Sequence, residues 1–149
     1  MSGDKKVVIV TGAEVAERIV RTALDRFGRI DTLVNNAGMF MVKNFTEFSQ
    51  KEFDDTLRTN VEGFFHITQL ALARMVEQRS GHLIQITATL ARHPIAGVNA
   101  ALASITKGAL DAVTRGLSLE YVKNGIRERA TFVTGETMHV DGGWHVGRW

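Results

Sequence analysis

Residues 31–38 read Asp-Thr-Leu-Val-Asn-Asn-Ala-Gly, and this stretch decides the fold. Its apolar part completes a predicted strand over 30–34, and the turn-forming cluster Asn35–Gly38 follows immediately. Upstream, residues 5–12 form a β-branched apolar run that ends in a glycine. Such a run predicts a fully buried strand of the kind found in parallel sheets.

Apolar residues recur at helical spacing around these strands. A spacing of four predicts a helix over 14–28, with Gly28 as its end. The remaining pattern predicts helices over 46–78 and 99–123 and strands over 82–87 and 131–140. Alternation of strands and helices is typical of an α/β fold, so we expect a Rossmann-like, doubly wound parallel sheet in a single domain, residues 1–149.

Length, charge and composition exclude several classes of protein. The chain has 149 residues, 44% of them hydrophobic, which is ordinary for one globular domain. Its net charge is +2 and it has no basic run, so nucleic acid is a poor candidate partner. We expect no membrane span, because no apolar stretch approaches 18 residues. The absence of cysteine permits a reducing compartment, and we expect a cytoplasmic protein.

Small and polar residues follow three predicted strands. They are Thr11–Gly12–Ala13, Asn35–Gly38 and Thr87–Ala88–Thr89. In open parallel sheets, ligands bind beyond the carboxyl ends of the strands. Taken singly, each cluster could be ordinary loop chemistry; together they predict a ligand cleft at one edge of the sheet.

The order of these clusters resembles the short-chain dehydrogenase/reductase family along essentially the whole chain. Residues 7–13 (VVIVTGA) resemble the first strand and the opening of its glycine-rich loop, and residues 31–38 (DTLVNNAG) resemble its Asn-Asn-Ala-Gly motif. Further similar segments are residues 59–63, 81–87, 107–110 and 133–144.

This resemblance implies an oxidoreductase that uses NAD or NADP and acts on a small alcohol or carbonyl compound. It implies cofactor binding by Thr11, Gly12, Asn35, Asn36, Ala37, Gly38 and Lys107. It also implies a homodimer or homotetramer, paired through the two long helices. For Asn35 and Asn36, shaping a turn is the simpler alternative.

Two matching residues carry the family's chemistry. Asn60 corresponds to its catalytic Asn, which implies a role in holding a water for proton relay; a buried Asn that bonds to backbone is compatible with this. Lys107 corresponds to the Lys that hydrogen-bonds the nicotinamide ribose. The alternative for Lys107 is a solvated surface position.

The family's tyrosine proton donor is missing. The position four residues before Lys107 is Ala103, and the position of the family's serine falls on Ala88, between Thr87 and Thr89. Thr87 and Thr89 are therefore candidate hydrogen-bond donors, because they flank the position of the missing serine. Ser104 is a third candidate, because it lies one helical turn from Lys107. A hydroxyl of this kind is a far weaker acid than a phenol, but it can stabilise an oxyanion. His93 is a further candidate acid, or simply a loop histidine.

Two functions follow from this pattern. The first is alcohol or carbonyl hydride transfer with a non-standard or impaired proton donor. The alternative is a catalytically silent, cofactor-binding or scaffolding subunit, which Ala88 and Ala103 favour. No metal site is expected, since His66, His82, His139 and His145 show no ligand spacing.

Relative to the family, two blocks are absent, one after Ala13 and one after Arg127. The first would contain the remaining phosphate-binding glycines and the residue that selects NAD or NADP. The second would contain the sixth strand and the substrate-covering loop. Either the protein is genuinely short or the sequence omits segments of a longer one. Omission is favoured, because losing the sixth strand would leave a gap in the sheet.

Overall fold

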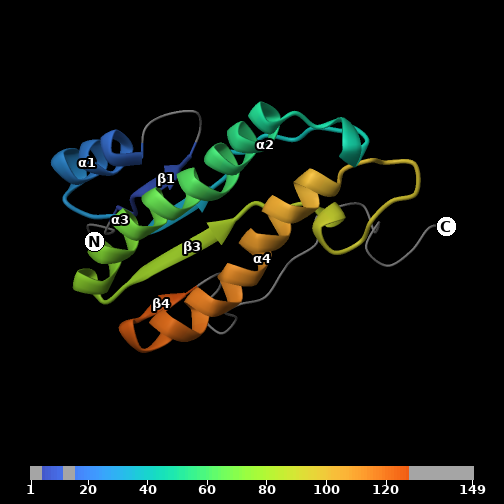
Figure 1. Ribbon diagram of the computed structural model, residues 1–149. Coiled ribbons are helices and arrows are strands. Elements are labelled where there is room, and N and C mark those ends of the chain that lie inside the picture. Colours follow the sequence, from blue (N-terminus) through green and yellow to red (C-terminus); the bar gives the residue numbers. More distant parts are fainter. Residues whose placement is uncertain (1–4, 12–15, 128–149) are drawn as a thin grey trace.

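The computed structural model describes residues 5–11 and 16–127, where a parallel sheet packs against helices (Figure 1). Its four strands lie in the order β1-β2-β3-β4, and all neighbours pair in parallel. They are β1 (Val8–Val10), β2 (Thr32–Asn35), β3 (Gly81–Gln85) and β4 (Ile126–Arg127). The predicted α/β, Rossmann-like sheet is confirmed.

The connections between the strands are helical. Strands β1 and β2 are joined by α1 (Ala16–Phe27), and Gly28 ends that helix in the left-handed region as predicted. Strands β2 and β3 are joined by η1 (Phe45–Glu47), α2 (Gln50–Leu57), η2 (Arg58–Glu62) and α3 (Gly63–Gln78). Strand β3 leads through η3 (Thr89–Ala91), α4 (Ala101–Tyr121) and η4 (Val122–Asn124) to β4.

The helix predicted over 46–78 begins later than expected. Ser49 is its N-cap, because the Ser49 hydroxyl accepts from the Glu52 N–H and the Glu52 carboxylate accepts from the Ser49 N–H. This capping box fixes the start of α2 at Gln50. The short η1 turn precedes it, separated by the extended Phe48. Within the helical run, residues 58–62 form a single π turn.

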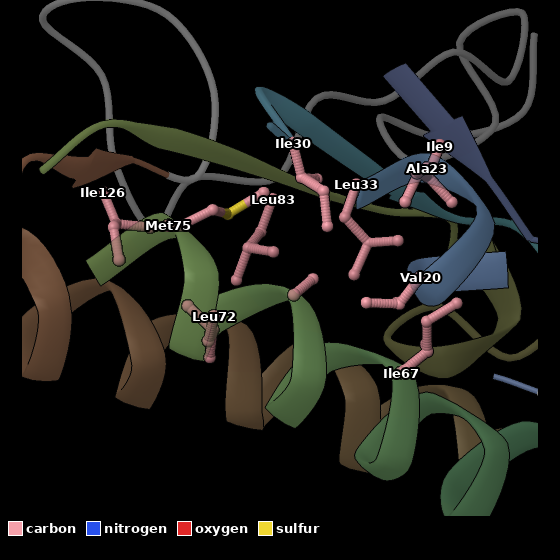
Figure 2. Close-up of a cluster of buried hydrophobic side chains, with 11 residues drawn as sticks. Ile9, Val20, Ala23, Ile30, Leu33, Ile67, Leu72, Met75, Leu83 and Ile126 are labelled. Atoms are coloured by element: carbon pink, nitrogen blue, oxygen red, sulfur yellow. The ribbon is translucent and has the colours of Figure 1, made fainter. Parts of the chain in front are cut away.

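The core lies between the sheet and the helices. Figure 2 shows Ile9, Leu33 and Leu83 of the strands with Val20 of α1 and Ile67 of α3. Leu117 and Tyr121 of α4 pack against the same cluster. All three crossovers run in one direction across the sheet, so right-handed connections put their helices on one face. The second helical layer of a doubly wound sheet is not seen in residues 5–11 and 16–127.

One expectation about β1 is wrong. The apolar run 5–12 predicted a strand buried on both faces, yet Val8 is 56% and Val10 is 59% exposed, while Ile9 between them is buried. Side chains alternate across a strand, and only the Ile9 face meets the helices. On the other face, Ile84 and Ile86 are also exposed. We call this side, with Val8, Val10, Ile84 and Ile86, the open face.

The structure adds a short strand beside β3. Sequence reasoning left Ile126 and Arg127 outside every predicted strand, but they form β4 and pair with Gly81 and His82. Gly125 makes this possible: its φ is +75°, and a Cβ there would collide with the Arg79 carbonyl. The predicted strand over 131–140 and the junction after Ala13 lie outside the described residues, and Arg127 is the last residue before the second junction.

Candidate active site

The carboxyl ends of β1, β2 and β3 meet at one edge of the sheet, where the candidate site lies. Thr11 fixes the turn after β2, since its hydroxyl oxygen accepts from the N–H groups of Asn36 (2.9 Å) and Ala37 (3.0 Å). The Thr11 N–H in turn donates to the Val34 carbonyl at 3.0 Å. Thr11 is thus a buried brace for the Asn-Asn-Ala-Gly turn. Gly12, predicted beside it, lies outside the described residues.

Asn35 braces the sheet from the helix side. Its Nδ2 donates to the Thr68 hydroxyl of α3 at 2.9 Å and to Oε1 of Gln85 in β3 at 3.1 Å. The Asn35 side chain is buried, and among the described residues its Oδ1 has no hydrogen-bond partner. Asn35 therefore has a structural role at the end of β2. Cofactor binding by residues 35–38 stays a prediction.

Asn60 lies in the π turn and is 1% exposed. Its Oδ1 accepts from the Met39 N–H at 2.7 Å, and its Nδ2 donates to the Met39 carbonyl at 2.9 Å. The same Nδ2 donates to the Thr106 hydroxyl of α4 at 3.0 Å. Asn60 therefore ties the segment after β2 to α4. Single π turns in helices frequently occur at functional sites.

Lys107 points into the same edge from α4. Its side chain is almost buried, and its Nζ donates to the Ile86 carbonyl at 2.9 Å. A Cβ on Gly38 would lie 2.9 Å from Nζ and 3.4 Å from Oδ1 of Asn60. The absence of a side chain at Gly38 thus lets the turn, the amine and the amide come together. Burial lowers the pKa of Lys107 below its ordinary value of 10.5. The solvated surface position considered for Lys107 is excluded.

The three candidate hydroxyl groups near the position of the missing tyrosine belong to Ser104, Thr87 and Thr89. Ala103 is buried in α4, and the Ser104 hydroxyl donates to the carbonyls of Leu90 (3.0 Å) and Ala100 (3.3 Å). Thr87 and Thr89 are half-buried after β3, where Thr89 begins η3. The catalytic roles predicted for these three hydroxyls stay predictions.

Sequence reasoning missed two contributors. Thr106 is not among the predicted site residues, yet its hydroxyl joins Asn60 to α4; its place directly before Lys107 was the available signal. The second is Asp111, buried on α4, which accepts from Arg92 at 2.8 Å and Arg115 at 2.9 Å. This pairing ties the segment after η3 to α4.

Beside the start of α4 lies a pocket of about 490 Å³. Its lining is mainly apolar and includes Phe45, Leu90, Pro94 and Val98, with the Ser104 side chain at its α4 wall. A pocket of this size and polarity suits a small organic molecule. Among the described residues, no group of three or more His, Asp or Glu side chains could hold a metal ion.

One observation shows that the hydrogen-bond donors of the site suit a nicotinamide cofactor. The buried Lys107 ammonium has three N–H groups, one of which serves the neutral Ile86 carbonyl. In the part of the chain that the structure describes, no carboxylate pairs with it. It therefore keeps donors for the hydroxyls of a sugar. Residues 12–15, next to the expected phosphate side, are not described.

Comparison with known proteins identifies the family. The short chain dehydrogenase family matches residues 6–135, so the chain belongs to that family of oxidoreductases. An uncharacterized oxidoreductase of Thermotoga maritima is 34% identical over 131 residues, which are 87% of this chain and 51% of the relative. One from Staphylococcus aureus is 32% identical over 79% of this chain and 50% of the relative. The chain thus spans about half the length of these curated relatives.

Solved structures agree in fold. The 3-ketoacyl-(acyl-carrier-protein) reductase of Brucella melitensis, complexed with NADH, has a TM-score of 0.72 and 30% identity, over 76% of this chain and 48% of that one. The F189W variant of actinorhodin polyketide ketoreductase, with NADPH, has a TM-score of 0.70 and 30% identity, over 76% of this chain and 43% of that one. Both similar proteins bind a reduced nicotinamide cofactor. None of the helices in the described residues is long and apolar enough to span a membrane.

Proposed function

We propose that this chain is an NAD(P)-dependent oxidoreductase that interconverts a small alcohol and its carbonyl compound. One observation carries the proposal: the Lys107 amine, Asn60 and the bare Gly38 turn meet at the carboxyl edge of the sheet. Because the Lys107 ammonium there contacts neutral acceptors, the site favours a ligand rich in hydroxyl groups over a second cation. The family membership and the cofactors of the two ketoreductases support the same conclusion.

Each part of the site has a separate task. When bound, the cofactor supplies or accepts the hydride. Lys107 and the turn Asn35–Gly38 would hold its ribose side, with Thr11 and Gly12 beside them. Asn60 fixes the Met39 backbone and so the position of the turn. The apolar pocket beside Ser104 would receive the organic part of the substrate.

Cofactor binding is the direct test. NADH and NADPH are titrated separately into the chain while the fluorescence of the nicotinamide is followed. We expect binding of one of them, and weakening of about tenfold or more in Lys107→Ala. Lys51→Ala, at an exposed lysine of α2, is the matched control. Absence of binding for both cofactors would refute the proposal.

The second candidate is a catalytically silent subunit that binds the cofactor or serves as a scaffold. Ala103 favours it, because a buried methyl group stands where the family has its tyrosine. Turnover against a broad panel of aldehydes, ketones and alcohols separates the two. Cofactor binding without turnover would favour the silent subunit.

Wider features of the proposal come from the sequence pattern. Residues 1–149 form one domain, and relative to the family the blocks after Ala13 and Arg127 are absent. The chain acts as a homodimer or homotetramer in the cytoplasm. Exposed Phe65 on α3 and Leu119 on α4 support pairing through these helices, since they leave apolar surface for a partner copy. Light scattering of the purified chain tests the oligomeric state.

A further inference from the structure

Neutral groups from three segments of the chain lie around Lys107. The turn after β2 offers Gly38 and Met39, the π turn offers the Asn60 amide, and the end of β3 offers the Ile86 carbonyl. None of these groups titrates. The amine is therefore the one titratable group at this junction among the described residues.

Charged side chains on the same elements are engaged elsewhere. On α4, Asp111 lies one turn beyond Lys107, but its carboxylate accepts from Arg92 and Arg115. On the π turn, Arg58 pairs with Asp55 and Glu62 with His66. No carboxylate of the described residues pairs with the Lys107 ammonium to hold its proton in place.

Carbonyl reduction also needs a proton source, and the hydroxyl candidates are weak ones. Ala103 has no acidic group, and Ser104 donates its hydroxyl to backbone carbonyls. An aliphatic hydroxyl gives up a proton far less readily than an ammonium. We propose that the Lys107 ammonium is itself the direct proton donor to the substrate oxygen, an inference that rests on the oxidoreductase function proposed above.

The step balances without a further reactant. In reduction, a C–H bond forms with the hydride from the reduced cofactor, the π bond of the carbonyl group breaks, and its electron pair moves to oxygen. The oxygen takes a proton from Nζ, which leaves a neutral amine, and solvent water returns the proton. In oxidation, the neutral amine would accept the proton as the O–H bond of the alcohol breaks. The freed electron pair would form the π bond of the carbonyl group, and the C–H bond would break as its hydride passes to the oxidised cofactor.

The surroundings of Nζ favour this role. Burial disfavours the charged form and lowers the pKa of Lys107, which makes the ammonium a better acid. Its four-carbon stem is flexible, and Nζ is held through one hydrogen bond to Ile86. Reduction is expected to slow as the pH rises through this lowered pKa, and oxidation to speed up.

Chemical rescue tests the proposal in the full chain. Lys107→Ala should lower turnover about 10²- to 10⁴-fold at saturating cofactor. Small primary amines of different pKa should restore it, with a rate that depends on the amine pKa. Lys107→Arg keeps the cation and a donor but cannot release its proton, so it should bind cofactor and stay slow. Lys51→Arg is the matched control for the substitution.

A second measurement needs neither turnover nor cofactor. Competitive labelling with acetic anhydride over a range of pH, read by peptide mass spectrometry, gives the titration of the Lys107 amine in the free chain. We expect a midpoint below the ordinary lysine value of 10.5. The exposed Lys51 on the same sample serves as the reference for reagent reactivity.

The outcomes separate the two proposals. If neither NADH nor NADPH binds, the oxidoreductase function fails and this inference fails with it. If cofactor binds and substrate turns over, but Lys107→Arg keeps turnover within about threefold, only the proton-donor role is overturned. It is also overturned if amine rescue is independent of amine pKa, if Lys107 titrates at or above 10.5, or if Ser104→Ala or His93→Gln alone removes the pH dependence.

Discussion

The two faces of the sheet have nearly the same composition and opposite surroundings. On one face, Ile9, Leu33 and Leu83 are buried against α1 and α3. On the open face, Val10 and Ile84 stand beside them in the same strands and are exposed. Burial therefore depends on which side the crossovers place the helices. It does not follow from the hydrophobicity of the residue.

The residues that stabilise the fold and the residues of the candidate site lie in different parts of the sheet. The covered face holds the core and the Asn35 brace, which fix the sheet. The candidate site lies at the edge, where the strands end and α4 brings in Lys107. Substitutions on the covered face should change the free energy of unfolding, and those on the open face should leave it nearly unchanged.

Leu33→Ala should have the largest effect. Leu33 is fully buried in β2, so the substitution removes apolar contacts and leaves a cavity. We expect a loss of about 2–5 kcal/mol in the free energy of unfolding, measured by urea denaturation. A cost below about 1 kcal/mol would mean that the covered face is poorly packed.

Asp31→Asn should come next and should depend on pH. Burial would raise the pKa of Asp31, but hydrogen bonds from Arg29 and the Val7 N–H, with Lys6 nearby, lower it overall. Its charge therefore stabilises the fold above the ordinary value of 3.8, and this contribution is lost as the pH falls through the lowered pKa.

At neutral pH we expect Asp31→Asn to cost about 2 kcal/mol, since a partly buried charged hydrogen-bond network loses its acceptor. The cost should shrink as both proteins are compared at lower pH. Asp25→Asn, at an exposed position of α1, is the control. An equal cost at pH 2 and pH 7 would contradict the role of the carboxylate.

Thr11→Val should have a smaller effect, concentrated at the site. It removes the acceptor for the N–H groups of Asn36 and Ala37 and keeps the shape of the side chain. We expect a loss of about 1 kcal/mol, with Thr11→Ser close to the unsubstituted protein. Hydrogen exchange of the two amides checks the cause, since only Thr11→Val should speed it.

Val10→Ala should have the smallest effect and is the sharpest test of the comparison. Val10 is largely exposed, so its loss should change the free energy of unfolding by only about 0.5 kcal/mol. The matched variant Ile9→Ala, one residue earlier in β1, should cost several times more. If Val10→Ala costs as much as Ile9→Ala, the open face is covered in solution.

Much of the site could be predicted because its residues lie in local patterns. The Asn35–Gly38 turn, Asn60 and Lys107 were identified from sequence, and the structure brings all three together. The partners that complete the site could not be found in this way. The Met39 backbone and the Ile86 carbonyl carry no pattern, because every residue has a backbone. Thr106 offered only its place directly before Lys107, which does not identify Asn60 as its partner.

By itself, the sequence determined the α/β alternation, the stop at Gly28 and the family's ordered motifs, because spacing and turn chemistry are local properties. Only the tertiary structure decided which face of β1 is buried, that Ile126 and Arg127 pair with β3, and that Lys107 has a neutral environment. These features depend on contacts between residues far apart in the chain. The direction of the crossovers and the packing of α4 determine these features, and no local sequence pattern predicts that direction or that packing.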